Sequence, residues 1–160
     1  MRGVIVKQPG GVDQLAVGEV PTPAPGPGEL LVRVRAAALN RADIQQREGN
    51  YPPPPGASQI LGLDAAGGVE QPGRGCRRYK VGDRVFGLLP GGGYAQYAVI
   101  PEDMAMPIPA RFTFEQAAAV PEVFLTAFQG LFWIGRLQAE ETVLIHAGAS
   151  GVGTAAIQLA

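Results

Sequence analysis

Cysteine and histidine are almost absent from this chain of 160 residues, which has one of each, Cys76 and His146. A single cysteine excludes an internal disulfide, and one cysteine with one histidine gives too few soft ligands for a zinc site. A charge imbalance is missing as well, because 13 basic and 14 acidic residues leave a net charge of −1. We therefore expect a metal-free protein of a reducing compartment, with neither nucleic acid nor an anionic membrane as a partner.

Long hydrophobic runs are also missing. The N-terminal segment MRGVIVKQPGG contains an apolar run too short for a secretory signal, and no stretch approaches the about 20 apolar residues that span a bilayer. These absences predict a soluble, cytoplasmic protein that binds small ligands. The hydrophobic content of 46% is sufficient for a core.

Before residue 110, short strand-like runs alternate with glycine and proline, which predicts a compact, barrel-like β domain. The runs are 2–7, 15–20, 29–36, 60–70, 83–89 and 94–100. One helix interrupts them over 41–48, with Asn40 as N-cap, Asp43 in its first turn and Gly49 after its last turn. The YPPPPG stretch from Tyr51 is expected to be an extended surface loop.

After residue 110 the hydrophobic period becomes helical. The segment TFEQ, from Thr113 to Gln116, is a capping box, and Pro121 suits the first turn of a second helix over 121–135. The run TVLIHA, 142–147, is typical of a strand buried on both faces of a parallel sheet, and 151–160 is expected to be helical. Trp133 and His146 are then expected in the core. We predict one domain over 1–120 and the start of a second over 121–160.

The last strand and helix are joined by the turn GASGVG, 148–153. In a dinucleotide-binding unit, backbone N–H groups at such a helix N-terminus bind a pyrophosphate. Gly148 and Gly153 match the outer glycines of the G-x-G-x-x-G fingerprint, whereas Ser150 replaces the middle one. Either the Ser150 hydroxyl donates to phosphate while Gly151 keeps the turn flexible, or the glycines only let a strand turn into a tightly packed helix.

Ordered segments along the whole chain carry a family resemblance. PGPGELLVRVRAAALNRAD, GLDAAGGVE, VGDRVFGLLPGGGYAQYAVIP, AAAVPEVFLTAF and VLIHAGASGVGTAAIQLA resemble the zinc-independent, zeta-crystallin-like quinone oxidoreductases of the medium-chain dehydrogenase/reductase superfamily. QREGNYPPPPGAS and LLPGGGYAQY are most similar to the tumour-suppressor-inducible subgroup. The resemblance implies a mainly β, chaperonin-10-like (GroES-like) barrel domain, followed by the first β-α unit of an α/β Rossmann domain that binds NADPH. It also implies hydride transfer to a quinone and a homodimer.

The same resemblance indicates which positions would hold a catalytic zinc ion. Zinc-dependent members of the superfamily carry a cysteine shortly before an aspartate, and then a GHE triplet. Here Asn40 stands ahead of Asp43, and GLD places Leu63 and Asp64 at the triplet. The resemblance thus implies hydride transfer without a metal, in which positioning and hydrogen bonds stabilise charge on the acceptor oxygen.

Site residues follow from the same resemblance. Tyr51 either donates its phenol hydrogen to the substrate or packs against the prolines after it. Asn40 either only caps its helix or also directs its amide toward nicotinamide and substrate. Thr126 either contacts the nicotinamide amide or bonds the backbone of its own helix. The expected catalytic residues are Tyr51 and Asn40, and the expected cofactor-binding residues are Asn40, Thr126, Gly148, Ser150, Gly151, Val152 and Gly153.

Two other functions remain open: an enoyl reductase of the same superfamily, and a GroES-like binding module without a cofactor. The residue that reads the adenosine ribose lies about 20 residues beyond the glycine turn, past Ala160. A parallel strand also needs neighbours, which this chain does not supply. We therefore expect the chain to be the front part of a longer enzyme that is inactive alone.

Overall fold

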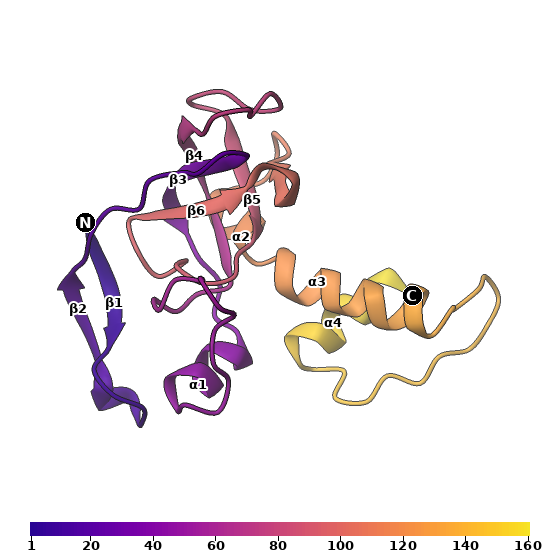
Figure 1. Cartoon of the computed structure of the whole chain (residues 1–160). Coiled ribbons are helices and arrows are strands. Elements are labelled where there is room, and N and C mark those ends of the chain that lie inside the picture. Colours follow the sequence, from indigo (N-terminus) through magenta and orange to yellow (C-terminus); the bar gives the residue numbers. More distant parts are fainter. The chain divides into compact units, whose positions relative to one another are not determined.

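The computed structural model describes residues 1–160, and the chain divides into two compact units, Met1–Ala119 and Val120–Ala160 (Figure 1). The first unit is built mainly from β-strands. The second unit is helical. The change of hydrophobic period along the sequence corresponds to this change of structure.

The first unit is a curled antiparallel sheet with the strand order β6-β3-β4-β5-β7. Its strands are β3 (Glu29–Ala36), β4 (Asp64–Pro72), β5 (Arg84–Leu88), β6 (Tyr97–Pro101) and β7 (Ala105–Pro107). A separate hairpin, β1 (Arg2–Val6) with β2 (Leu15–Glu19), is joined to it through the bridge between Gly3 and Ala95. This is the GroES-like half-barrel that the sequence predicts, although β7 was not expected and β4 begins at Asp64, later than Ile60.

The sheet closes over one hydrophobic core. Apolar side chains from neighbouring strands meet there, among them Leu30 and Val32 of β3, Val69 of β4 and Ile100 of β6. Close approach of two strands depends on Gly67, because a Cβ at this position would overlap the carbonyl oxygen of Arg33. The β3–β4 pairing shifts its register beside this contact, which bends the sheet.

Short helices connect the strands. Helix α1 (Arg41–Arg47) begins at the expected N-cap, Asn40, and forms a capping box in which the Asp43 carboxylate accepts from the backbone N–H of Asn40 at 2.8 Å. It ends before Gly49, whose φ of 83° is the left-handed conformation that glycine favours. Helix α2 (Phe114–Ala118) begins with the predicted Thr113 capping box, and the 3-10 turns are η1 (Val12–Gln14) and η2 (Glu102–Met104).

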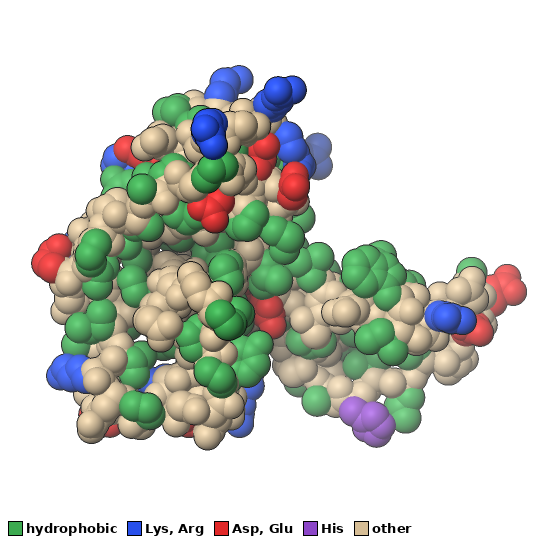
Figure 2. Space-filling model, in the orientation of Figure 1, with side chains coloured by type: hydrophobic (Ala, Val, Ile, Leu, Met, Phe, Trp, Pro, Cys, Tyr) green, Lys and Arg blue, Asp and Glu red, His purple; other side chains and the backbone are tan.

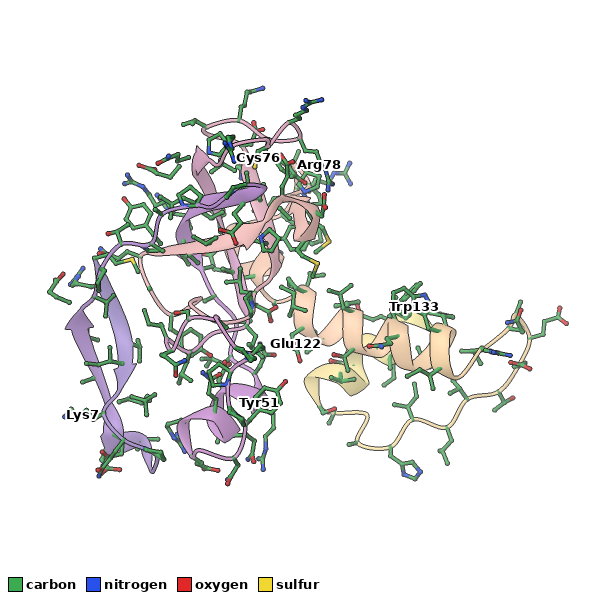
Figure 3. All side chains as sticks on the ribbon, viewed as in Figure 1. Lys7, Tyr51, Cys76, Arg78, Glu122 and Trp133 are labelled. Atoms are coloured by element: carbon green, nitrogen blue, oxygen red, sulfur yellow. The ribbon has the colours of Figure 1, made fainter.

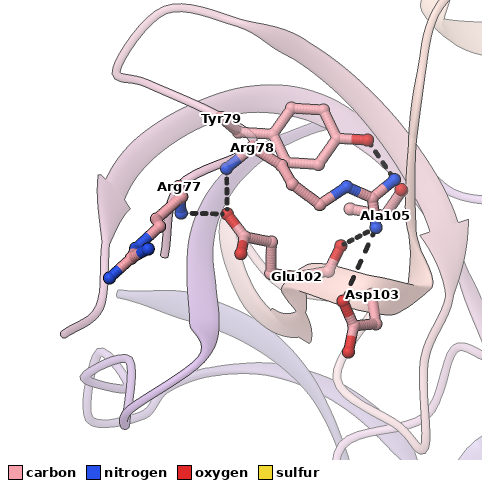
Figure 4. A network of polar contacts seen from close by, with 6 residues as sticks. All are labelled: Arg77, Arg78, Tyr79, Glu102, Asp103 and Ala105. Atoms are coloured by element: carbon pink, nitrogen blue, oxygen red, sulfur yellow. Dashed lines mark hydrogen bonds and ion pairs between the residues drawn. The ribbon is translucent and has the colours of Figure 1, made fainter. Parts of the chain in front are cut away.

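The basic segment between β4 and β5 is ordered by a carboxylate from a distant part of the sequence (Figure 4). Glu102 Oε1 accepts from the backbone N–H groups of Arg77 at 2.9 Å and Arg78 at 2.8 Å. The Tyr79 hydroxyl donates to the carbonyl oxygen of Ala105 at 2.7 Å. The arginine side chains themselves are exposed, so this segment is a solvated basic loop.

The second unit packs two helices through small side chains. Helix α3 (Pro121–Phe128) starts at Pro121 as predicted and continues into a π-helix, η3 (Gln129–Ile134). Helix α4 (Gly151–Leu159) lies against α3, and Ala127, Ala155 and Ala156 are buried between them. Alanine at these contacts lets the helix axes approach closely.

Three predictions for the second unit are wrong. Residues 142–147 form no strand, and Leu144 is 80% exposed, because no other strand of the chain accepts and donates hydrogen bonds beside this segment. His146 is exposed as well (Figure 2). Trp133 is 70% exposed on the helix surface, where its ring meets that of Phe128 edge-on at 5.8 Å (Figure 3).

One helical segment, Phe114–Ile134, is long and apolar enough to cross a membrane by length and composition, with 21 residues and a mean hydropathy of 1.4. The sequence prediction that no stretch approaches about 20 apolar residues did not anticipate this segment, whose charged side chains are those of Glu115 and Glu122. It consists of α2, α3 and η3, with a break between Ala118 and Pro121. Core helices of soluble proteins have the same composition.

Candidate functional site

A polar junction in the first unit holds the start of α1 against two other segments of the chain. It consists of Asn40, Asp43, Asp64 and Tyr94, together with the backbone of Gly62. Asn40 is the N-cap of α1, and Asp43 lies in the first turn. Asp64 is the first residue of β4, and Tyr94 precedes β6. Several elements therefore converge on the residue that the sequence assigns to catalysis.

The carboxylate of Asp43 is the centre of this junction and is only 4% exposed. Its Oδ2 accepts from the backbone N–H of Asn40 at 2.8 Å and from the Tyr94 hydroxyl at 2.6 Å. Its Oδ1 accepts from the backbone N–H of Gly62 at 3.1 Å. Three donors replace the water that burial removes, so the buried carboxylate oxygens keep hydrogen-bond partners in the fold.

The phenol of Tyr94 acts in this junction as a donor. Burial, followed by its hydrogen bond to Asp43, raises the pKa of Tyr94 well above its usual value. The hydroxyl also lies 3.1 Å from the carbonyl oxygen of Ala38, but its single hydrogen favours the shorter contact to the charged oxygen. Tyr94 therefore remains protonated over the physiological pH range.

The side chain of Asn40 is held by a second buried acid. Its Nδ2 donates to Oδ2 of Asp64 at 2.8 Å, and Asp64 is 1% exposed. Asn40 itself is only partly buried. Capping is therefore not the only role of this side chain in the fold, since it also bonds to β4.

A cavity of about 400 Å³ adjoins the junction. Its walls are mostly apolar, although five of its lining residues have polar or charged side chains. The residues that line it are Leu15, Leu39, Asn40, Arg41, Asp43, Ile44, Arg47, Leu61 and Tyr94. The volume lies in the range of about 300 to 1,000 Å³ that small-molecule sites occupy.

Tyr51 lies on the proline-rich loop that follows α1, and its side chain is 50% exposed (Figure 3). The loop forms no strand or helix, as predicted. Part of the Tyr51 surface is thus accessible to a ligand. Packing against the neighbouring prolines and contact with a substrate both agree with this placement.

Potential metal ligands are dispersed. No group of three or more His, Cys, Asp or Glu side chains in residues 1–160 is arranged to hold a metal ion. Cys76 is in the first unit, where its thiol donates to the carbonyl oxygen of Glu29 at 3.3 Å, and His146 is in the second unit. Leu63, at the place of the zinc-binding histidine in the resemblance, has no metal-binding atom.

The glycine turn and the start of α4 form a compact cradle in the second unit. Ser150 is the N-cap, and its Oγ accepts from the backbone N–H of Gly153 at 3.0 Å. Gly153 admits no side chain, because a Cβ there would overlap the carbonyl oxygen of Ala147. That carbonyl also accepts from the Ser150 N–H at 2.9 Å, and Ala147 has a φ of 54°. The N–H groups of Gly151 and Val152, at the open end of α4, remain for a ligand.

The candidate residues from the sequence thus fall into separate places. Asn40 and Tyr51 are in the first unit, while Thr126, exposed on α3, and the glycine turn are in the second. Sequence reasoning identified Asp43 only as a helix-start acid, and did not assign roles to Asp64 or Tyr94. For Asp64, the available signal was a charged residue within the apolar run 60–70, because a buried carboxylate needs donors.

The chain is similar to known proteins in sequence and in structure. The alcohol dehydrogenase GroES-like domain matches residues 26–110. The human synaptic vesicle membrane protein VAT-1 homolog is 39% identical over 161 residues, which are 99% of this chain and 41% of that protein. The chain therefore spans about two fifths of this curated relative.

Solved structures of several activities are similar to nearly the whole chain. The quinone oxidoreductase from Coxiella burnetii has a TM-score of 0.89 at 32% identity, over 99% of this chain and 52% of that one. A mycobacterial protein complexed with NADPH has a TM-score of 0.89 at 34% identity, over 99% and 49%. The CurK enoyl reductase has a TM-score of 0.90 at 30% identity, over 99% and 50%.

Proposed function

The chain belongs to the alcohol dehydrogenase GroES-like domain family of the medium-chain dehydrogenase/reductase superfamily, and from this premise we propose that it forms the N-terminal portion of an NADPH-dependent quinone oxidoreductase that works without zinc. The observation that carries the proposal is the polar junction. At the places of the zinc ligands in related enzymes, this chain has Asn40 and Leu63. The Asn40 amide donates a hydrogen bond to the buried Asp64. An amide, not a metal, is thus available to the reacting atoms.

The chemistry proposed for this site depends on hydrogen-bond donors. When bound, NADPH supplies a hydride to the quinone. Negative charge then develops on a quinone oxygen, because that oxygen receives no proton in the same step. The Asn40 amide and the exposed Tyr51 phenol are groups of the first unit that stabilise such charge by donation. Asn40 lines the neighbouring cavity, whose mostly apolar walls lower the local dielectric and so strengthen a hydrogen bond from its amide.

The residues of the α4 cradle suit the pyrophosphate of NADPH. Gly151 and Val152 offer backbone N–H groups at a helix N-terminus, where the helix dipole favours an anion. Gly153 and Ser150 keep the turn tight, and the hydroxyl hydrogen of Ser150 remains free to donate while its oxygen accepts from Gly153. Thr126 is proposed to bind the nicotinamide amide, as the family resemblance implies. The similar mycobacterial protein is a complex with NADPH.

The proposal includes a cytoplasmic homodimer of the whole enzyme, with no nucleic acid or membrane partner. These points rest on the family resemblance and the balanced charge of the sequence.

An enoyl reductase is the second candidate, and the similarity to the CurK enoyl reductase favours it. Both reactions transfer a hydride to a conjugated acceptor, so the same donors serve both. The two candidates differ in substrate: a free quinone ring in one case and an alkene conjugated to a thioester in the other.

The decisive experiment measures NADPH oxidation by the natural protein that carries this chain. The acceptors are benzoquinone, phenanthrenequinone and crotonyl-CoA. Turnover with the quinones supports the proposal, and turnover with crotonyl-CoA alone assigns an enoyl reductase. If none of the three acceptors is reduced and NADPH does not bind, the chain is a binding module.

A site-directed comparison tests the donors. We expect Tyr51→Phe to lower quinone turnover about tenfold, the cost of roughly one hydrogen bond, with little change in NADPH affinity. Tyr79→Phe is the matched control, because the Tyr79 hydroxyl is engaged with Ala105. Unaltered kinetics of Tyr51→Phe would assign its ring to packing.

A further inference from the structure

We propose that Asp64 is a positioning residue, which fixes the amide of Asn40 in the one orientation that presents an N–H to the ligand. The inference deepens the proposed function, because it rests on contact between Asn40 and the cofactor or the acceptor. Asp64 itself touches neither of them in this proposal. It acts through Asn40.

The orientation follows from the chemistry of the two groups. An ionised carboxylate only accepts hydrogen bonds, whereas an asparagine amide donates at one end and accepts at the other. Nδ2 of Asn40 lies 2.8 Å from Oδ2 of Asp64. A flipped amide would place its carbonyl oxygen against the carboxylate, which is repulsive in a site where Asp64 is 1% exposed. The amide is therefore held in one of its two orientations.

The backbone around Asn40 is fixed by the other members of the junction. Its N–H donates to Asp43, and Asp43 is in turn held by Gly62 and Tyr94. The carbonyl end of the Asn40 side chain is directed to the first turn of α1 in the capping box. Nδ2 carries two hydrogens, and the bond to Asp64 uses one of them. The second hydrogen is the directed donor.

The position of Asp64 gives this contact a rigid base. Asp64 begins β4 and is in register with Leu88 of β5, so its backbone is part of the central sheet. A donor fixed in advance on a rigid element needs no reorganisation as charge develops on the acceptor oxygen. Loss of Asp64 is therefore expected to reduce turnover more than binding.

The variant Asp64→Asn keeps the size of the side chain and removes the charge. Two facing amides pair in either orientation, so Asn40 is then free to flip. We expect kcat for quinone reduction to fall about tenfold, with KM for the quinone nearly unchanged. Glu70→Gln, on the same strand, is the matched control, because the Glu70 carboxylate pairs with Arg33 at the surface.

A double-mutant cycle separates positioning from a general effect on the fold. Asn40→Ala, Asp64→Asn and the double variant are compared in the natural protein that carries this chain. If Asp64 acts through Asn40, Asp64→Asn has no further effect on kcat once Asn40 is alanine. Additive losses of kcat would overturn the proposal.

A measurement on the chain of 160 residues makes the test independent of activity. In ¹⁵N-labelled protein, the side-chain amide of Asn40 is expected to give two well-separated proton signals with slow solvent exchange. Asp64→Asn should bring the two signals closer and speed their exchange, while Glu70→Gln should change neither. Unchanged Asn40 signals in Asp64→Asn would refute the positioning role even if the enzyme reduces quinones.

Folding of the variants is checked by thermal melting. If Asp64→Asn does not fold, Asp64→Glu decides the question, because a longer carboxylate still accepts from Nδ2 but displaces it. We expect Asp64→Glu to keep one amide orientation, seen as separated Asn40 signals. Merged signals in a folded Asp64→Glu protein would overturn the proposal. If the natural protein reduces neither quinones nor enoyl thioesters, the proposed function fails, and the amide signals still decide the role of Asp64.

Discussion

The hydrogen bond from Tyr94 to Asp43 is expected to make an unusually large contribution to the stability of the first unit. Its oxygen atoms lie 2.6 Å apart, its acceptor is charged, and Asp43 is buried. Hydrogen bonds to charged groups contribute about 1.5 to 3 kcal/mol, against about 0.5 to 1.5 kcal/mol for neutral pairs. We therefore expect Tyr94→Phe to lower the free energy of unfolding by about 2 kcal/mol.

The matched control is Tyr79→Phe, whose hydroxyl donates to a neutral carbonyl at 2.7 Å in the same unit. Its expected loss is about 1 kcal/mol. Urea unfolding should be followed by far-ultraviolet circular dichroism, because the single tryptophan, Trp133, is in the second unit and does not report on the first. The urea midpoint should fall by about 1 M for Tyr94→Phe. Equal losses in the two variants would refute the role of the charged acceptor.

The pH dependence of the difference in unfolding free energy between wild type and Tyr94→Phe gives a second test of this hydrogen bond. Burial and Asp43 raise the pKa of the Tyr94 phenol, while in the unfolded chain the phenol has its ordinary pKa of about 10. The stabilisation by Tyr94 is then complete below about pH 10 and is lost as the pH rises further toward the folded-state pKa. The gap in unfolding free energy between wild type and Tyr94→Phe should be constant from neutral pH to about pH 9 and should then narrow. A gap that does not narrow above about pH 10 would contradict the assignment.

The remaining predictions concern the second unit, α2 and the metal. Thr113→Ala removes the N-cap that accepts from Gln116 at 3.2 Å, and should cost about 1 kcal/mol in urea unfolding. Gly153→Ala should abolish NADPH binding in fluorescence titrations, since its Cβ overlaps Ala147, and retained affinity would exclude this turn as the cofactor site. Leu144→Lys should reduce association of the chain in sedimentation velocity, because Leu144 is an exposed apolar side chain. Elemental analysis of the natural protein should show no stoichiometric zinc, and bound zinc at one per chain would contradict the metal-free mechanism.

The sequence predicts most of the first unit because local signals and tertiary structure agree there. Alternating apolar residues between glycine and proline turns mark β3 at its observed bounds, and Thr113 with Gln116 marks the start of α2. The second unit shows where this agreement fails. An apolar run such as 142–147 becomes a strand only beside other strands, and hydrophobicity alone does not reveal whether they exist.

The candidate site is predictable only in part for a related reason. Asn40 and the glycine turn are recognised from local pattern and family resemblance. The partnership of Asn40 with Asp64, and that of Asp43 with Tyr94, joins residues 24 and 51 positions apart. Such pairings follow from the register of the sheet, which a single sequence specifies through many weak preferences.

The Asp43 junction also has a consequence for the order of folding. Gly62 and Tyr94 are 19 and 51 residues from Asp43 along the chain, and each ring closure has an entropic cost before the carboxylate gains its donors. Helix α1 has only seven residues and is marginal without tertiary contacts. During synthesis, Asn40 therefore gains its final geometry only after residue 94 has left the ribosome, so shorter nascent chains contain β3, β4 and β5 but not the oriented Asn40 amide.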